Sequence, residues 1–241
     1  MTPMGPASWA VLLSEALTMA QVTALMAAIL GPTGLFFLVV GIRRGDRTLA
    51  YYGGYMTLLL GAFAVQLGFQ TGTGSTGWRS WLGNFIQLPY AWCYLRFVRH
   101  YFELGGEGRL AGWARAYRVL EWAYLVPLAL LAVPLLRAVS PTSWIILALN
   151  LSNLLGSFLL GCWALTRREP GAGRFVAANV PLTLSGVLHS LQWALQPEGL
   201  PINGILPFWL GVILQLGLFG VVLMIRWQQT GRSRREVLAH A

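Results

Sequence analysis

The stretch Leu206–Trp227 reads LPFWLGVILQLGLFGVVLMIRW, and it decides the fold of this chain. It carries no strongly polar side chain except Gln215 until it reaches Arg226. An α-helix needs roughly 20 such residues to cross the hydrocarbon core of a bilayer, because it rises only about 1.5 Å per residue. The stretch is therefore predicted to be a transmembrane helix.

Further stretches of similar length and composition precede it: Leu17–Ile42, Thr48–Gln70, Ser80–Phe102, Val119–Arg137, Ser143–Thr166 and Phe175–Leu195. The chain has a mean hydropathy of +0.60 and only 10% charged residues, compared with about 25% in ordinary soluble domains. We predict an all-α integral membrane protein, a bundle of seven transmembrane helices over residues 17–228. An outer apolar segment, residues 1–16, precedes the bundle, and a basic cytoplasmic tail, residues 229–241, follows it.

The distribution of arginine gives the expected orientation. The chain has no lysine, and most of its arginines lie in the tail, in alternate gaps between the apolar stretches or near the stretch ends that flank these regions. They are Arg43, Arg44, Arg47, Arg96, Arg99, Arg109, Arg115, Arg118, Arg167, Arg168, Arg174, Arg226, Arg232, Arg234 and Arg235. Only Arg79 and Arg137 fall on the other side. Because arginine-rich short loops stay in the cytoplasm, we expect the N-terminus outside and the C-terminus in the cytoplasm. Arginine used to the exclusion of lysine is typical of GC-rich genomes and favours a bacterial inner membrane.

Several functional classes are excluded by the residues that the chain lacks. The net charge of +9 is spread over short loops, which favours contact with membrane lipids and not with nucleic acid. A retinal Schiff base needs a lysine, and because the chain has none, a rhodopsin is excluded. The acidic residues lie in loops, in tails or near helix ends, and of the histidines only His189 lies well inside a stretch. We therefore expect no enzyme activity, no metal site and no cofactor.

Uncharged polar side chains concentrate in the outer halves of the predicted helices. They are Gln66, Gln70, Asn84, Gln87, Asn150, Asn153, His189 and Gln192, with Gln215 near the middle of the last helix, and most recur at a spacing of three or four residues. Such spacing places each pair on one helix face. Because an amide facing lipid without a partner costs several kcal/mol, these faces must point inward. Asn179 is the one amide in an inner half.

Two interpretations of these amides remain open. They either hydrogen-bond between helices as structural contacts, or they line an outward-opening cup for a small uncharged ligand.

Other patterns carry structural expectations. Pro127 and Pro134 should bend the fourth helix, and a surface helix is expected around Arg109–Arg118. Tyr52, Tyr55 and Tyr94 are among the aromatic residues expected in the belt at the inner membrane interface.

Four stretches resemble a known family. They are Arg43–Tyr55 (RRGDRTLAYYGGY), Phe97–Leu104 (FVRHYFEL), Arg167–Phe175 (RREPGAGRF) and Leu210–Gly220 (LGVILQLGLFG). Together they resemble the bacterial seven-transmembrane receptors with diverse intracellular signalling modules, in the transmembrane region of that family. The resemblance implies a bundle that links an outer sensory part to a kinase, cyclase or diguanylate cyclase inside. The seven-helix sensors of some histidine kinases share the topology.

From the cup and the resemblance together we expect a membrane receptor, a sensor that transduces the binding of an outer ligand or partner. Only a short tail follows Trp227, so the cytoplasmic output module is expected in trans or removed from this chain, with a kinase or cyclase as partner and a homodimer left open. Displacement of the last helix, with Arg226–Glu236 as its extension, would carry the signal. The alternative is a small-solute membrane transporter of seven-helix type, and a third interpretation is a non-catalytic scaffold.

Overall fold

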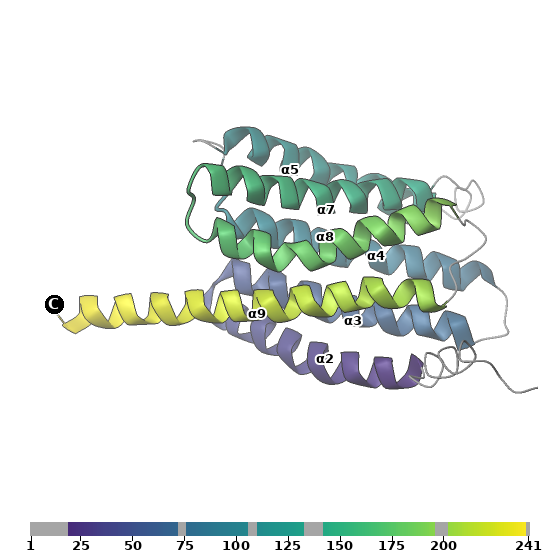
Figure 1. Cartoon of the computed structure of the whole chain (residues 1–241), viewed down its shortest axis with the longest axis horizontal. Coiled ribbons are helices and arrows are strands. Elements are labelled where there is room, and N and C mark those ends of the chain that lie inside the picture. Colours follow the sequence, from purple (N-terminus) through teal and green to yellow (C-terminus); the bar gives the residue numbers. More distant parts are fainter. Residues whose placement is uncertain (1–18, 72–75, 106–109, 133–141, 196–201, 240–241) are drawn as a thin grey trace, which may run out of the picture. The chain divides into compact units, whose positions relative to one another are not determined.

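The computed structural model describes residues 19–71, 76–105, 110–132, 142–195 and 202–239 (Figure 1). Every regular element in these ranges is an α-helix. The chain divides into two compact units, Met1–Leu149 and Asn150–Ala241, and the boundary falls within one helix. The predicted outer segment 1–16 lies outside the described residues.

The helices in chain order are α2 (Met19–Arg44), α3 (Arg47–Thr71), α4 (Thr76–Tyr101), α5 (Ala111–Ala123), α6 (Leu125–Ala132), α7 (Thr142–Thr166), α8 (Ala172–Leu195) and α9 (Ile202–Ala239). All predicted stretches except the fourth correspond to one helix each. Three windows in the described part of the chain are long and apolar enough to cross a membrane: Ala27–Arg44, Trp144–Thr166 and Leu210–Gln228.

The fourth predicted helix differs from the expectation. Helix α5 begins at Ala111 and ends at Ala123, and α6 begins at Leu125. A helix is therefore present where one was expected around Arg109–Arg118, and it continues to Ala123 before the break that precedes α6. The break is explained by Pro127, because a proline lacks an N–H and its ring clashes with the carbonyl four residues earlier, here that of Ala123. The bend predicted at Pro127 is thus present, and Pro134 lies outside the described residues.

In the first unit, α2 and α3 approach each other closely. A Cβ atom placed on Gly53 would collide with the backbone of Leu38 on α2 and would lie 2.7 Å from the carbonyl oxygen of Gly34. Only glycine allows this approach of the two backbones. The turn between these helices begins α3 with a cap, because Asp46 Oδ1 accepts hydrogen bonds from the N–H groups of Thr48 (2.9 Å) and Leu49 (3.2 Å).

An aromatic core holds α3 against α4, which corrects the expectation of an interfacial belt for three tyrosines. Tyr52, Tyr55 and Tyr94 are buried. The ring of Tyr52 lies 5.2 Å from Phe97, and the ring of Tyr55 lies 5.1 Å from Tyr94. Belt residues face the lipid headgroups, whereas these rings face neighbouring helices. Pairs at such distances add about 0.5–1.5 kcal/mol beyond their buried area.

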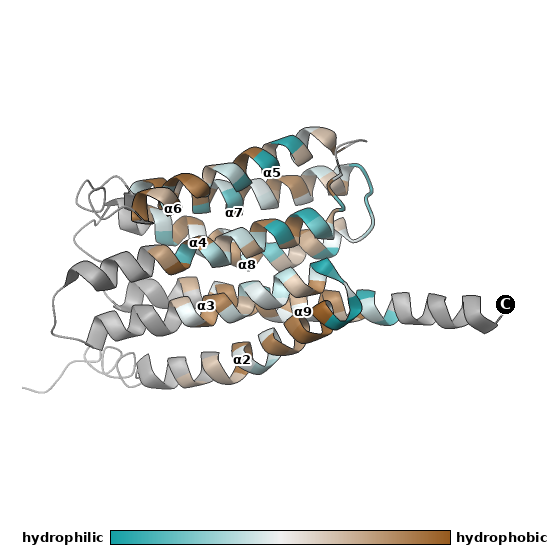
Figure 2. Cartoon of the chain, turned by 180° about the vertical axis from the view of Figure 1, so that it is seen from behind, coloured by the Kyte–Doolittle hydropathy of each residue, from teal (hydrophilic) through white to brown (hydrophobic). Residues whose placement is uncertain are grey.

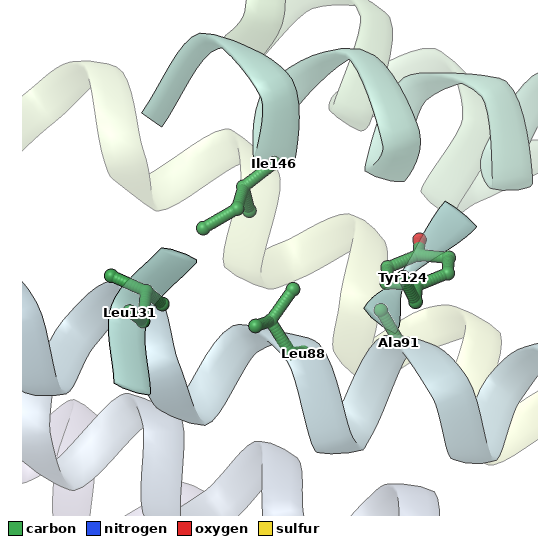
Figure 3. Packing of buried hydrophobic residues seen from close by; sticks show 5 residues of the cluster. All are labelled: Leu88, Ala91, Tyr124, Leu131 and Ile146. Atoms are coloured by element: carbon green, nitrogen blue, oxygen red, sulfur yellow. The ribbon is translucent and has the colours of Figure 1, made fainter. Parts of the chain in front are cut away.

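A second apolar cluster joins α4, the α5–α6 junction, α6 and the first turns of α7. It consists of Leu88, Ala91, Tyr124, Leu131 and Ile146, and Figure 3 shows these side chains converging from their helices. Tyr124 sits at the break between α5 and α6 and is 2% exposed. The break therefore places a large side chain in the core of the first unit.

The second unit contains α8, α9 and most of α7. Each of these helices has an exposed apolar stripe, for example Leu184, Leu188 and Leu191 on α8, and Leu210, Leu214 and Leu218 on α9. Exposed large aliphatic residues at helical spacing over the whole length of a helix suit an exterior solvated by lipid. Figure 2 shows α2 and the apolar part of α9 coloured as hydrophobic.

Helix α9 is the longest in the described part of the chain. It has 38 residues, which corresponds to about 57 Å at 1.5 Å per residue. Figure 1 shows it running past the ends of α7 and α8. From Arg226 to Ala239 the helix continues for about 20 Å. The expected helical extension beyond Arg226 is therefore present.

Candidate functional site

A buried polar bond joins α8 to α9. Gln215 Nε2 donates a hydrogen bond of 2.9 Å to Asn179 Oδ1, and neither residue is exposed to solvent or lipid. Inside a membrane an interhelical bond of this kind stabilises the packing by about 0.6 kcal/mol on average and up to about 2 kcal/mol. The bond fixes the register of α9 against α8, because a shift of either helix would separate the two bonded amide groups.

Further contacts on both sides of this bond follow one antiparallel register. Phe175 meets Phe219 edge to face at 5.2 Å, and His189 stacks on Phe208 at 4.9 Å. Between the Asn179–Gln215 bond and the His189–Phe208 stack, Gly211 lies against Ser185. We call these four pairs the α8–α9 seam. As the residue number rises along α8, that of the partner on α9 falls by a similar amount, as expected for antiparallel neighbours.

Gly211 is the point of closest approach in the seam. A Cβ atom placed there would collide with Ser185 Oγ and would lie 2.7 Å from the carbonyl oxygen of Pro181. By contrast, a Cβ on Gly217 would meet nothing within 4 Å. These two glycines of α9 therefore differ in role, because Gly211 allows the helices to touch and Gly217 does not lie at a close contact.

The hydroxyl groups near the seam are satisfied within their own helices. Thr183 Oγ1 donates to the carbonyl oxygen of Asn179 at 2.9 Å, and Ser185 Oγ donates to that of Leu182 at 3.2 Å. On α7, Ser157 Oγ donates to the carbonyl oxygen of Asn153 at 2.7 Å. Such bonds to the preceding turn satisfy hydroxyl donors inside a membrane bundle.

The nine predicted ligand residues are placed as follows. The side chains of Gln66, Gln70, Asn84 and Gln192 lie outside the residues whose side chains are described. Gln87 is half-buried on α4 in the first unit, and Asn150 and His189 are half-buried in the second. Asn153 and Gln215 are buried. The cup as a whole stays a prediction.

Within the second unit, one of the predicted ligand residues is bonded to an amide that was not among them. Gln215 is bonded to Asn179, the amide that had been set apart because it lies in an inner half. Toward the C-terminal end of α8, His189 Nδ1 is buried and has no hydrogen-bond partner among the described residues. A buried polar atom without a partner is unusual in a native protein, so His189 remains a candidate for contact with a ligand.

Sequence reasoning missed a charged cluster in the first unit. Glu121, on α5, is 9% exposed. Its carboxylate lies 3.1 Å from Arg96 Nε and 3.0 Å from Arg99 Nη1, both on α4. Glu121 had been placed with the acids near helix ends and so was assigned no role. The available signal was the spacing of Arg96 and Arg99, which puts both arginines on one face of a predicted helix.

The sequence pattern of the 7TM diverse intracellular signalling family matches residues 20–226, nearly the whole described chain. The chain belongs to this family. The suspected relationship is therefore confirmed, and the protein is a membrane protein of a signalling type. No curated protein matches the chain, and no solved structure does.

The stretches that suggested the 7TM diverse intracellular signalling family map onto the turns and the seam. Arg43–Tyr55 covers the turn from α2 to α3, and Phe97–Leu104 covers the end of α4. Arg167–Phe175 forms the turn from α7 to α8, where Arg168 and Gly171 adopt positive φ angles of 58° and 80°. Leu210–Gly220 contains Gly211, Gln215 and Phe219 of the seam. The recognisable parts of this family member are thus the parts that set helix register and helix turns.

Proposed function

We propose that the chain is a bacterial inner-membrane receptor in which an outer ligand or partner displaces α9 along the α8–α9 seam. The N-terminus would lie outside and the C-terminus in the cytoplasm, with seven membrane passes. The observation that carries the proposal is the continuity of α9, because one helix connects the buried Gln215 to the extension beyond Arg226. Any axial or rotational movement at Gln215 would be transmitted along this helix.

The character of the seam supports movement of α9. The Asn179–Gln215 bond contributes only about 0.6–2 kcal/mol, so a ligand with a few kcal/mol of preference for another register could change the packing. His189, whose Nδ1 lacks a described partner, stacks on Phe208 nearer the outer end of the same seam. A ligand bound there would touch both helices of the seam.

The ligand would be small and uncharged. It would contact the predicted cup of Gln66, Gln70, Asn84, Gln87, Asn150, Asn153, His189, Gln192 and Gln215. The chain itself would catalyse no reaction, and the signal would pass to a kinase or cyclase module in trans or beyond this chain.

The test uses spin labels on two exposed residues of the second unit. Arg167→Cys and Gln228→Cys would be labelled in a chain with Cys93→Ala and Cys162→Ala and reconstituted in nanodiscs. Pulsed electron paramagnetic resonance then measures the distance distribution between the labels. A receptor should show two populations, and Gln215→Leu should change their ratio. A single distribution that Gln215→Leu leaves unchanged would contradict the proposal.

A second measurement separates a receptor from a carrier. Proteoliposomes holding the full chain would be incubated with a panel of labelled monosaccharides, polyols and small amides. We expect no uptake above that of empty liposomes. Any panel solute that shifts the label distances should lose this effect in Gln66→Leu/Gln192→Leu. Uptake of a solute would identify the chain as a transporter instead.

A further inference from the structure

The charged cluster of the first unit, Arg96, Arg99 and Glu121, has a net positive charge. One carboxylate, that of Glu121, pairs with two guanidinium groups, those of Arg96 and Arg99. The three side chains therefore carry a net charge of one positive unit. Burying an excess charge inside a membrane protein is costly, so the cluster is better explained if an anion completes it.

The guanidinium groups still have donors to offer. The side chains of Arg96 and Arg99 are 30% and 24% exposed, compared with 10% for Glu121. Arg99 Nη1 donates to both carboxylate oxygens of Glu121, whereas Arg96 Nε is paired with Glu121 by charge but has no hydrogen-bond partner among the described residues. Each guanidinium has five N–H donors in a planar fork, a geometry that matches the oxygens of a phosphate group. The ring of Trp92 lies 4.8 Å from the Arg96 guanidinium carbon and helps to hold it.

The residues of α5 around Glu121 change from basic to apolar along the helix. Arg118, one turn before Glu121, is exposed. Trp122, next to Glu121 on α5, is 71% exposed, and Leu125, the first residue of α6, is 45% exposed. Residues three and four apart share a helix face. A ligand on this face would meet cations at one end and apolar surface at the other.

The neighbouring helix adds positive charge at the same end. The Tyr51 ring, on α3, stacks on the His100 ring, on α4, at 5.2 Å. Arg47 lies one turn before Tyr51 and is exposed. Helices α3, α4 and α5 thus each present an arginine at the end of the first unit where α4 finishes.

We propose that Arg96 and Arg99 bind the phosphate of an anionic phospholipid whose acyl chains lie along Trp122 and Leu125. The lipid sits in the leaflet beside the arginine-rich turns. Glu121 holds the two guanidinium groups in place and at the same time competes with the phosphate for them. The site does not depend on the receptor function proposed above.

Native mass spectrometry of the full chain, released from detergent micelles, tests the site. The probes are dioleoylphosphatidylglycerol and the zwitterionic dioleoylphosphatidylcholine. We expect the wild-type chain to bind phosphatidylglycerol about tenfold more tightly, as two arginines near a headgroup phosphate would give. Arg96→Gln/Arg99→Gln/Glu121→Gln should lose this preference. Equal binding of the two lipids by the wild type would overturn the proposal.

The matched control is Arg174→Gln. It changes the net charge by the same one unit as the triple variant and alters an exposed arginine of the second unit. It should keep the preference for phosphatidylglycerol. If it loses the preference as the triple variant does, the effect belongs to overall charge and the site is wrong.

Glu121→Gln gives an independent and opposite result. It keeps both guanidinium groups and removes the competing carboxylate, so phosphatidylglycerol should bind several-fold more tightly. A purely structural ion pair predicts weaker or unchanged binding, and that outcome would contradict the site even if the triple variant fails to fold. Excess inorganic phosphate and glycerol phosphate should not displace the lipid. Full displacement by either would mean that a soluble phosphate, and not a lipid, is the ligand.

Discussion

At the scale of single residues, the second unit depends on one amide pair within an apolar interior. Gln215 and Asn179 each satisfy part of the other's hydrogen-bonding capacity at 2.9 Å. Removing one member leaves a buried acceptor or donor without that bond, at a cost of about 1–3 kcal/mol, whereas replacing both with apolar groups costs less. The pair therefore stabilises the seam less than its single variants would suggest.

We expect Gln215→Leu and Asn179→Leu each to lower the free energy of unfolding by about 1–3 kcal/mol. The double variant should lose less than the sum of the two single losses. Each single variant leaves one buried amide without its partner, whereas the double variant leaves neither amide behind. Steric-trap unfolding in bicelles measures the free energy of unfolding of the wild type, the two single variants and the double variant. Gln228→Leu, an exposed glutamine on the same helix, is the control and should change stability by less than about 0.5 kcal/mol. Additive losses would show that the two amides do not act as a pair.

The sequence indicated that Gln215 must face another helix, but not which residue it meets. Depth along each helix was inferred from the ends of the apolar stretches, and this separated Asn179 from the outer amides. Pairing depends on the register between helices, which the linear sequence does not contain. Glu121 was missed for a related reason, because its pairing depends on how α5 packs against α4, where Arg96 and Arg99 lie.

At the scale of helices, hydropathy predicts where a helix lies and small residues predict how closely two helices meet. The bounds of α7 and α8 agree with their predicted stretches to within a few residues, since apolar length is a strong signal in membranes. The helix expected around Arg109–Arg118 is present as the first part of α5, where Ala111–Arg118 is amphipathic and carries arginines. That pattern fits a surface helix as well as the first turns of a buried one.

Gly211 and Gly217 of α9 provide a matched test of helix contact. Gly211→Val should separate α8 from α9, because its Cβ would collide with Ser185, and should cost about 1–3 kcal/mol. Gly217→Val makes the same change of residue where a Cβ meets nothing within 4 Å. Thermal unfolding in detergent should therefore show a lower midpoint for Gly211→Val than for Gly217→Val. Equal midpoints would mean that the close approach does not stabilise the unit.

At the scale of the whole molecule, the predicted orientation in the membrane rests on the arginines. In each unit the arginine-rich turns join helices at one end: α2 to α3 in the first unit and α7 to α8 in the second. The alternation of arginine-rich and arginine-poor loops was evident in the sequence, because it can be read from the order of apolar stretches and loops alone. The family was also evident, because its characteristic stretches lie in these turns and in α9.

Cysteine accessibility tests the orientation. Arg168→Cys and Glu198→Cys would be introduced separately into the chain with Cys93→Ala and Cys162→Ala. In intact spheroplasts a membrane-impermeant maleimide should label Glu198→Cys at once and Arg168→Cys only after the cells are opened, because short arginine-rich loops stay in the cytoplasm. The reverse order of labelling would place the N-terminus inside and contradict the proposed direction of signalling.

The spacing of polar groups on α8 has a mechanical consequence. Thr183 lies one turn beyond Asn179 on the same side of α8, and its hydroxyl oxygen can also accept a hydrogen bond. A slide of α9 by one turn, about 5.4 Å, would bring Gln215 level with Thr183, but it would also put the Gln215 side chain where Gly211 now lies against Ser185. The two helices therefore cannot pass from one register to the next at their present separation, and a full-turn slide of α9 requires them to move apart first.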